Sequence, residues 1–193
     1  CCMYDETQIK IMDATMTLII EKGYSGATTK EIARLAGVNE STIFRRFGEK
    51  KEIVTAAMEL PKWNPGLSEE DFIYHGNLEE DLLAFSTIYM KKVTPQMVKV
   101  SIGLRSAELE GAALPGIMQV PLVFKRVLIK YFTEMTAQGR MRECSVESLA
   151  IQFISMNFGF VFLDASFGNK LIRVSKKKYI QDSIRVFVSG IEL

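Results

Sequence analysis

Hydroxyl, carboxylate and guanidinium side chains in the second half of residues 28–47 have a spacing that suits DNA recognition. These side chains belong to Glu40, Ser41, Thr42 and Arg45. In a helix they point away from the apolar residues Ile43 and Phe47, so they form one outward face. The major groove of DNA is read by such side chains on one exposed helix. The pattern therefore predicts a nucleic-acid contact.

Positively charged residues follow directly and form a compact patch of a size that suits phosphate. The cations are Arg45, Arg46, Lys50 and Lys51, beside a single anion, Glu49. Lys and Arg side chains supply the phosphate contacts of DNA-binding proteins. The net charge of the whole chain is only +1, so any attraction to DNA is local. A solvated helix surface gives the same local pattern, and the patch alone does not decide between the two.

Two short helices must position these side chains. Ala33, Gly37 and Ile43 have the small, glycine and apolar spacing of a helix-turn-helix, in which the glycine ends the first helix. Thr28 with Glu31 predicts a capping box at the start of the first helix, and Asn39 predicts the N-cap of the second. Ordinary helical bundles also contain this geometry, so the spacing leaves DNA binding and a purely structural pair open.

Flanking helices complete a first domain, which we place at residues 1–60. Apolar residues at helical spacing run from Ile9 to a glycine stop at Gly23 and would cover the back of the helix pair. A fourth helix over 49–60 follows the second helix of the pair directly, so its movement would carry that helix with it, like a lever.

The remaining chain, residues 61–193, is predicted to be a second, all-helical domain. Prolines, glycines and acidic residues at 61–76 mark the boundary. Helical patterns then continue to the end of the chain, with no strand signal of weight. The expected helices cover 77–93, 95–109, 116–138, 145–167 and 175–191. The fold class is therefore all-α.

Residue types needed for catalysis or metal binding are sparse. The single histidine, His75, lies in the predicted linker, and no glycine-rich phosphate loop or metal-ligand spacing occurs. The carboxylates cluster at positions expected on the surface. The sequence predicts no enzyme, no metal and no cofactor.

Three cysteines, Cys1, Cys2 and Cys144, form no disulfide or metal pattern, which favours a reducing cytoplasm. No signal peptide is recognised, and the absence of methionine at position 1 suggests a trimmed N-terminus. The 149–167 stretch has about the length of a membrane span. Polar residues interrupt it, however, and a mid-membrane aspartate such as Asp164 costs about 2.5–3.5 kcal/mol. We expect a buried bundle helix and no membrane.

The first sixty residues resemble the TetR family of bacterial transcriptional repressors. The resemblance is carried by Ile11 to Ala14, Gly23-Tyr24, Thr28-Thr29, Glu31 to Ala33, Ala36 to Val38, Thr42 to Phe44, Phe47-Gly48 and Lys50. It covers about a third of the chain, and the remainder resembles the family only in being helical and of suitable length. The resemblance implies a homodimer on a palindromic DNA operator, with one recognition helix of each subunit in successive major grooves.

The resemblance also implies roles for single residues. Thr29 and Lys30 match positions that touch phosphate or a base edge, and Glu40, Ser41 and Thr42 match the variable base-reading face. Arg46 matches a position often occupied by a phosphate-contacting histidine, and Lys50 matches a phosphate-contacting lysine. Phe44 replaces a frequent tyrosine, so its ring can pack on sugar or a thymine methyl group without a hydroxyl bond. Together with Arg45, these are the expected DNA-binding residues.

An effector pocket in the second domain is a further implication of the resemblance. Adaptable methionines and flat aromatics suit a small hydrophobic ligand, although the same residues can simply form the core. The candidates are Phe85, Tyr89, Met97, Phe124, Met135, Phe153, Met156, Asn157 and Phe160. The last two helices, about 145–167 and 175–192, are too apolar to face water and are predicted to form the dimer surface.

The leading hypothesis is a dimeric, cytoplasmic repressor that a small, largely apolar effector releases from its operator. A constitutive or protein-partnered DNA-binding regulator without an effector is the alternative. The sequence does not decide between repression and activation.

Overall fold

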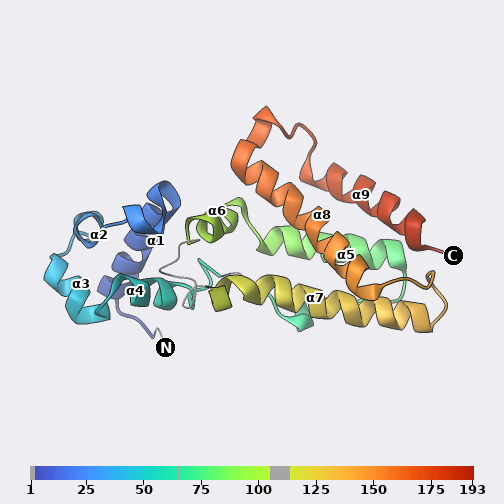
Figure 1. The fold of residues 1–193 in the computed structure, drawn as a ribbon, viewed down its shortest axis with the longest axis horizontal. Coiled ribbons are helices and arrows are strands. Elements are labelled where there is room, and N and C mark those ends of the chain that lie inside the picture. The colour runs from blue at the N-terminus through green and yellow to red at the C-terminus, as the bar shows by residue number, and fades with distance from the viewer. Residues whose placement is uncertain (1–2, 65, 105–113) are drawn as a thin grey trace. The chain divides into compact units, whose positions relative to one another are not determined.

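The computed structural model describes residues 3–64, 66–104 and 114–193, which contain nine α-helices (Figure 1). They form two compact units. The first comprises Cys1–Pro65 with Gln96–Met118, and the second comprises Gly66–Pro95 with Gln119–Leu193. The predicted all-α class is confirmed.

The first unit contains six helical segments. They are α1 (Glu6–Gly26), α2 (Thr29–Ala36), α3 (Glu40–Phe47), α4 (Lys50–Ala57), α6 (Pro95–Gly103) and the first turn of α7 (Leu114–Ala137). The expected helix over 49–60 is therefore α4, which ends three residues early at Ala57. The expected helix over 95–109 is α6, and its residues 105–109 lie outside the described part of the chain.

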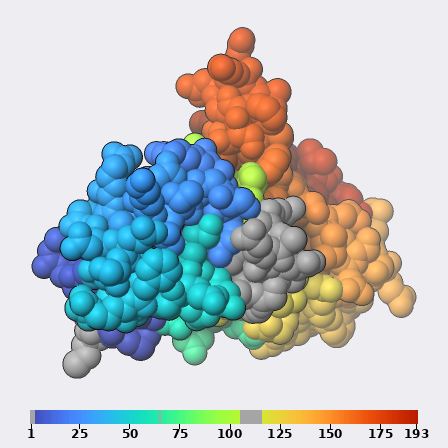
Figure 2. All heavy atoms as spheres, turned by 60° about the vertical axis from the view of Figure 1, so that its left-hand side comes forward, coloured from blue at the N-terminus to red at the C-terminus, as the bar shows by residue number. Residues whose placement is uncertain are grey.

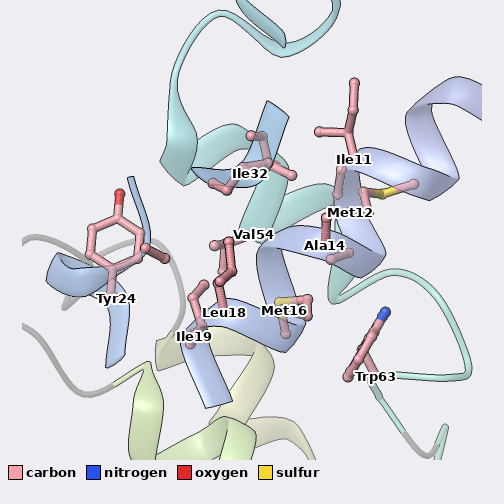
Figure 3. Close-up of a cluster of buried hydrophobic side chains, with 14 of the residues drawn as sticks. Ile11, Met12, Ala14, Met16, Leu18, Ile19, Tyr24, Ile32, Val54 and Trp63 are labelled. Carbon is pink, nitrogen blue, oxygen red and sulfur yellow. The ribbon is translucent and has the colours of Figure 1, made fainter. Parts of the chain in front are cut away.

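Side chains from three helices meet in the core of this unit. Ile11, Met12 and Ile19 of α1 pack in one cluster with Ile32 of α2 and Val54 of α4, and Figure 3 shows them converging. Each of these side chains is fully buried. The burial explains why α1 is needed, since α2 and α3 are eight residues each and contribute few buried residues of their own.

Two glycines with positive φ lie where the sequence predicted helix ends. Gly37 has a φ of 69°, and its N–H donates to the carbonyls of Ala33 and Arg34 at the end of α2. Gly23, with a φ of 74°, breaks the helical conformation inside α1. Both angles lie in the region that favours glycine. The stop at Gly37 is confirmed, whereas Gly23 kinks α1, which continues to Gly26.

Helix α6 belongs to the first unit, whereas the sequence pattern placed it in the second domain. Val100 and Leu104 are buried in the same core as α1. Gly103 lies against α1 so closely that an added Cβ would be 2.6 Å from the carbonyl oxygen of Ile19. The glycine is therefore what allows the two helices to touch.

The second unit consists of η1 (Glu69–Asp71), α5 (Leu78–Lys92), the rest of α7, α8 (Val146–Phe167), η3 (Gly168–Lys170) and α9 (Lys176–Ile191). Helix α5 packs against both α8 and α9. Aromatic rings fill the space between them: Tyr89 stacks on Phe124 at 4.6 Å between ring centroids, and Phe124 contacts Phe153 at 5.9 Å.

One carboxylate lies in this core, against the expectation that the carboxylates are on the surface. Asp81 of α5 is only 3% exposed. It accepts hydrogen bonds from the backbone N–H groups of His75 and Gly76, both at 2.8 Å, and from the Tyr131 hydroxyl at 3.0 Å. Three donors compensate for the lost hydration, and the carboxylate ties the segment before α5 to α7. Burial raises the pKa of Tyr131, and the negative charge of Asp81 raises it further.

By length and composition alone, α8 with the three residues after it could cross a membrane. Only 33% of its most apolar 18-residue stretch is buried in the structure. Apolar side chains on its outer surface remain exposed, among them Ile151, Leu163 and Phe167. Cys144, just before α8, is exposed and free, whereas Cys1 and Cys2 lie outside the described residues.

Candidate nucleic-acid interface

Helix α3 presents a polar and aromatic surface because Ile43 and the half-buried Phe47 anchor its other side. Ile43 is fully buried against α1 and α2. Ser41, Arg45 and Arg46 are exposed, and the Phe44 ring is 53% exposed although it is apolar. Figure 2 turns this side of the first unit forward, where α2 and α3, bright blue to cyan, form a convex surface. A convex surface with exposed hydrogen-bonding side chains suits a groove.

The starts of α2 and α3 are joined by a side-chain hydrogen bond. The Thr29 hydroxyl donates to the carboxylate of Glu40, and both residues are half-buried. Lys30, the next residue, is exposed. The structure thus brings Thr29 and Glu40 together beside the exposed part of α3, as one fixed polar pair. Thr42 is half-buried.

Arg46 has an acidic partner in the segment before α1. Its guanidinium lies 2.8 Å from an Asp5 carboxylate oxygen, and both side chains are about two-fifths exposed. Asp5 is also the N-cap of α1, where its other oxygen accepts from the Gln8 N–H. A phosphate group and Asp5 would therefore compete for the same guanidinium.

The neighbouring Tyr4 connects the same segment to the turn after α4. Its hydroxyl donates to Glu59 at 2.6 Å. This hydrogen bond, with partial burial and the negative charge of Glu59, raises the pKa of Tyr4 to about 12, so the hydroxyl stays protonated at neutral pH. Tyr4 and Asp5 thus join the start of α1 to the ends of α3 and α4.

Lys50 has a structural role besides the predicted phosphate contact. Its ammonium group donates to the Tyr24 carbonyl at 2.7 Å and lies 3.9 Å from the centroid of the Tyr24 ring. These contacts place a positive charge at the start of α4, next to α3. Lys51 pairs with Glu49 at 3.2 Å, so the anion that the sequence placed in the basic patch has a cation beside it.

Asp13 of α1 holds the segment after α4. One of its carboxylate oxygens accepts from the Trp63 indole N–H at 3.1 Å, and the other lies 2.7 Å from the Lys62 ammonium group. Trp63 is buried in the core of the first unit. The segment after α4 is therefore fastened to α1, while Lys50 holds the start of α4. The lever movement of α4 stays a prediction.

The sequence interpretation did not include Asp5, Tyr4 and Asp13 among the residues that shape this surface. For Asp5, a signal was present, because Asp5 with Gln8 forms a capping box. For Tyr4 and Asp13, the partners lie 55 and 50 positions along the chain, and no local pattern points to them.

Eight of the nine predicted effector-pocket residues belong to the second unit, where ring contacts join Tyr89, Phe124 and Phe153. The buried ones are Phe85, Tyr89, Phe124, Met135, Phe153, Asn157 and Phe160, and Met156 is half-buried. Met97 belongs to the first unit and is not among them. Ser86, which the sequence did not single out, is buried beside Phe85. A pocket role for these residues stays a prediction.

Removing the charge of Asp5 should strengthen DNA binding. In Asp5→Asn, the amide still caps α1, since asparagine is as good an N-cap as aspartate, but it no longer holds Arg46 by charge. We expect tighter binding to any duplex by up to about fivefold at low salt, from the usual strength of an exposed ion pair. The gain should shrink as salt is added, because salt screens exposed charges. Fluorescence anisotropy with a labelled duplex measures this.

Glu6→Gln is the matched control. It makes the same charge change one residue later, where the carboxylate pairs with Lys10 of α1 and not with α3. An equal gain in both variants would mean that net charge, and not the contact with Arg46, limits DNA binding.

Comparison with known proteins agrees with this geometry. Residues 11–57 match the family of bacterial regulatory proteins of the tetR type. The helix-turn-helix transcriptional regulator YvkB of Bacillus subtilis (strain 168) is 30% identical over 185 residues, which is 96% of this chain and 97% of that protein. The chain belongs to the TetR family. It is a DNA-binding transcriptional regulator, as its relatives are.

Solved structures show that the fold of this TetR-family regulator extends through the second unit. NalD, the secondary repressor of the MexAB-OprM multidrug efflux pump in Pseudomonas aeruginosa, matches with a TM-score of 0.70, 15% identity and coverage of 97% of this chain and 96% of that one. FadR from Bacillus subtilis, solved with stearoyl-CoA, matches with a TM-score of 0.70, 20% identity and coverage of 95% and 99%. At these identities the likeness concerns the fold alone.

Proposed function

We propose that this TetR-family regulator is a dimeric repressor that binds a palindromic operator and leaves it when a small, largely apolar effector binds. The exposed α3 surface carries the DNA part of the proposal, because Ser41, Phe44 and Arg45 face outward while Ile43 fixes the helix from behind. The cytoplasm is the compartment in which such a protein would meet its DNA.

A second copy of the chain is the proposed partner of the outer face of α8 and α9. Exposed apolar side chains gather there, among them Ile151 and Leu163 of α8 and Val186 of α9. The end of α8, orange in Figure 2, stands clear of the rest of its unit. Apolar area of this kind is unfavourable in water and is usually covered by a partner. Two copies of this pair of helices would form a four-helix bundle.

Two buried polar atoms in the second unit support an effector that carries hydrogen-bonding groups. Ser86 Oγ and Asn157 Oδ1 have no hydrogen-bond partner among the described residues. A buried polar group without a partner costs about 1–3 kcal/mol, and a bound ligand could supply the missing bond. The stearoyl-CoA bound to FadR supports a long apolar ligand in a protein of this fold.

Selection of duplexes from a random DNA pool by the purified chain, at a stated salt concentration, tests the DNA part. We expect a palindrome whose half-sites are about 34–36 Å apart, one helical turn, or a multiple of that distance. Enrichment of a single half-site would contradict the dimer, and no enrichment above non-specific binding would contradict sequence-specific regulation.

Release of the selected duplex tests the effector part. Stearoyl-CoA and free fatty acids of several lengths are suitable probes, with thermal unfolding of the protein as a second readout. If all of them leave both the DNA complex and the unfolding temperature unchanged, the constitutive or protein-partnered alternative is favoured.

Disrupting the apolar face should separate the copies. Val186, 74% exposed on α9, would lie inside the proposed interface, where the carboxylate in Val186→Glu would be buried without a partner. We expect this variant to elute as a monomer at concentrations where the unaltered chain is a dimer, with light scattering as the measurement. Gln181→Glu is the control, since residue 181 lies about 140° around the same helix. If each of the two variants remained a dimer, the interface would lie elsewhere on the chain.

A further inference from the structure

We propose that Glu40 makes this regulator select a cytosine at one position of each operator half-site. The inference rests on the proposed sequence-specific binding and concerns which base the recognition helix prefers. It is carried by the place of Glu40 in the fold, by its hydrogen bond to Thr29 and by the chemistry of a carboxylate in the major groove.

The place of Glu40 is the first turn of the recognition helix. Glu40 is the first residue of α3, directly after the N-cap Asn39 and directly before the exposed Ser41. In helix-turn-helix proteins, the N-terminal residues of the recognition helix contact base edges. A negative charge here is also favoured by the helix dipole, which stabilises an ionised carboxylate at this end.

The hydrogen bond from Thr29 fixes the carboxylate before DNA arrives. The Thr29 hydroxyl, at the start of α2, donates to Oε1 of Glu40. Both side chains are half-buried, so the long glutamate side chain loses its rotational freedom in the free protein and not on binding. The second carboxylate oxygen, Oε2, is not used by the Thr29 bond.

An ionised carboxylate accepts hydrogen bonds and donates none, so it cannot bind phosphate and must find a donor. In the major groove only the amino groups of cytosine and adenine donate. The adenine amino group lies beside the N7 acceptor, which repels a carboxylate. The cytosine amino group has no acceptor beside it on the same base edge. Cytosine is therefore the base that Glu40 favours.

Duplex selection with the full-length chain and its Glu40→Gln variant tests the inference. The glutamine amide can still accept from Thr29, so the fold is kept, and circular dichroism checks this. We expect a cytosine in each half-site selected by the unaltered chain, preferred by at least about fivefold. In E40Q that position should change to adenine, which a glutamine binds through both the amino group and N7.

Glu31→Gln is the matched control, because it makes the same change on α2, where the carboxylate pairs with Lys22. It should leave the selected sequence unaltered. A second variant, Thr29→Val, removes the donor and should weaken the cytosine preference without replacing it. An identical palindrome from the unaltered chain and from E40Q would overturn the role of Glu40 while leaving the proposed function intact. Absence of any selected sequence from the unaltered chain would overturn both.

Discussion

Replacing Asp81 with alanine is expected to lower the free energy of unfolding by about 3 kcal/mol or more. The change leaves three donors without an acceptor, namely the His75 and Gly76 N–H groups and the Tyr131 hydroxyl. Each buried donor without a partner costs about 1–3 kcal/mol. Urea unfolding followed by circular dichroism at 222 nm measures the loss, since the second unit is largely helical.

Two further variants show whether the hydrogen bonds are the cause. Glu79→Ala removes a carboxylate from the same first turn of α5, but at an exposed position, and should change stability by about 0.5 kcal/mol or less. Tyr131→Phe removes one of the three donors. Asp81→Ala combined with Tyr131→Phe should lower the free energy of unfolding by less than the sum of the two single losses, because both changes remove the same hydrogen bond. A loss in Asp81→Ala no larger than in Glu79→Ala would show that the network does not stabilise the fold.

Placing a methyl group on Gly103 is expected to destabilise the first unit. In Gly103→Ala the new Cβ would lie 2.6 Å from the Ile19 carbonyl oxygen and 3.0 Å from Ile19 Cγ2. A backbone atom cannot move aside as a flexible side chain can, so α6 would have to leave α1. Overpacking of this kind costs about 1–3 kcal/mol, and it would expose Val100 and Leu104. Thermal unfolding measures the loss.

The same substitution at Gly190 should not lower the unfolding temperature. Gly190 lies inside α9, where an added Cβ meets open space among the described residues. Alanine is a better helix former than glycine by about 1 kcal/mol, so Gly190→Ala should be neutral or stabilising when it is made in the Val186→Glu background, which removes the proposed interface on this face of α9. Two glycine variants with equal unfolding temperatures would mean that the contact between α6 and α1 can relax at little cost.

The helix-turn-helix could be predicted because its determinants are local. Ala33, Gly37 and Ile43 lie within eleven residues, and each is needed for a reason that residue type alone expresses: small size, a positive φ and an apolar anchor. Helix boundaries elsewhere were predicted to within a few residues for the same reason, since caps such as Asn77 and Ser145 act on their own helix.

The charge partners of the DNA-binding residues could not be predicted in this way. Lys50 contacts Tyr24, which is 26 positions away, and Thr29 contacts Glu40 across eleven positions. Residue type indicates that a lysine or a glutamate can form such a bond, but only the packing of α1 to α4 against one another decides with which partner. The positions of the cations could therefore be predicted, but the residues that they contact could not.

The burial of single polar residues also could not be predicted from the sequence. Asp81 falls in an acidic first turn with Glu79 and Glu80, and these two glutamates are exposed while Asp81 is buried. For α6, the apolar pattern is equally consistent with either unit. Its place follows from the close approach at Gly103, which depends on the surface of α1.

The anchoring of Trp63 gives the chain an intrinsic optical signal. It is the only tryptophan in the sequence, and its indole is buried in the first unit with its N–H on Asp13. Its emission therefore reports the environment of the DNA-binding unit and of nothing else. A compound that binds the second unit and shifts this emission would reveal, without any label and without DNA, that the two units communicate.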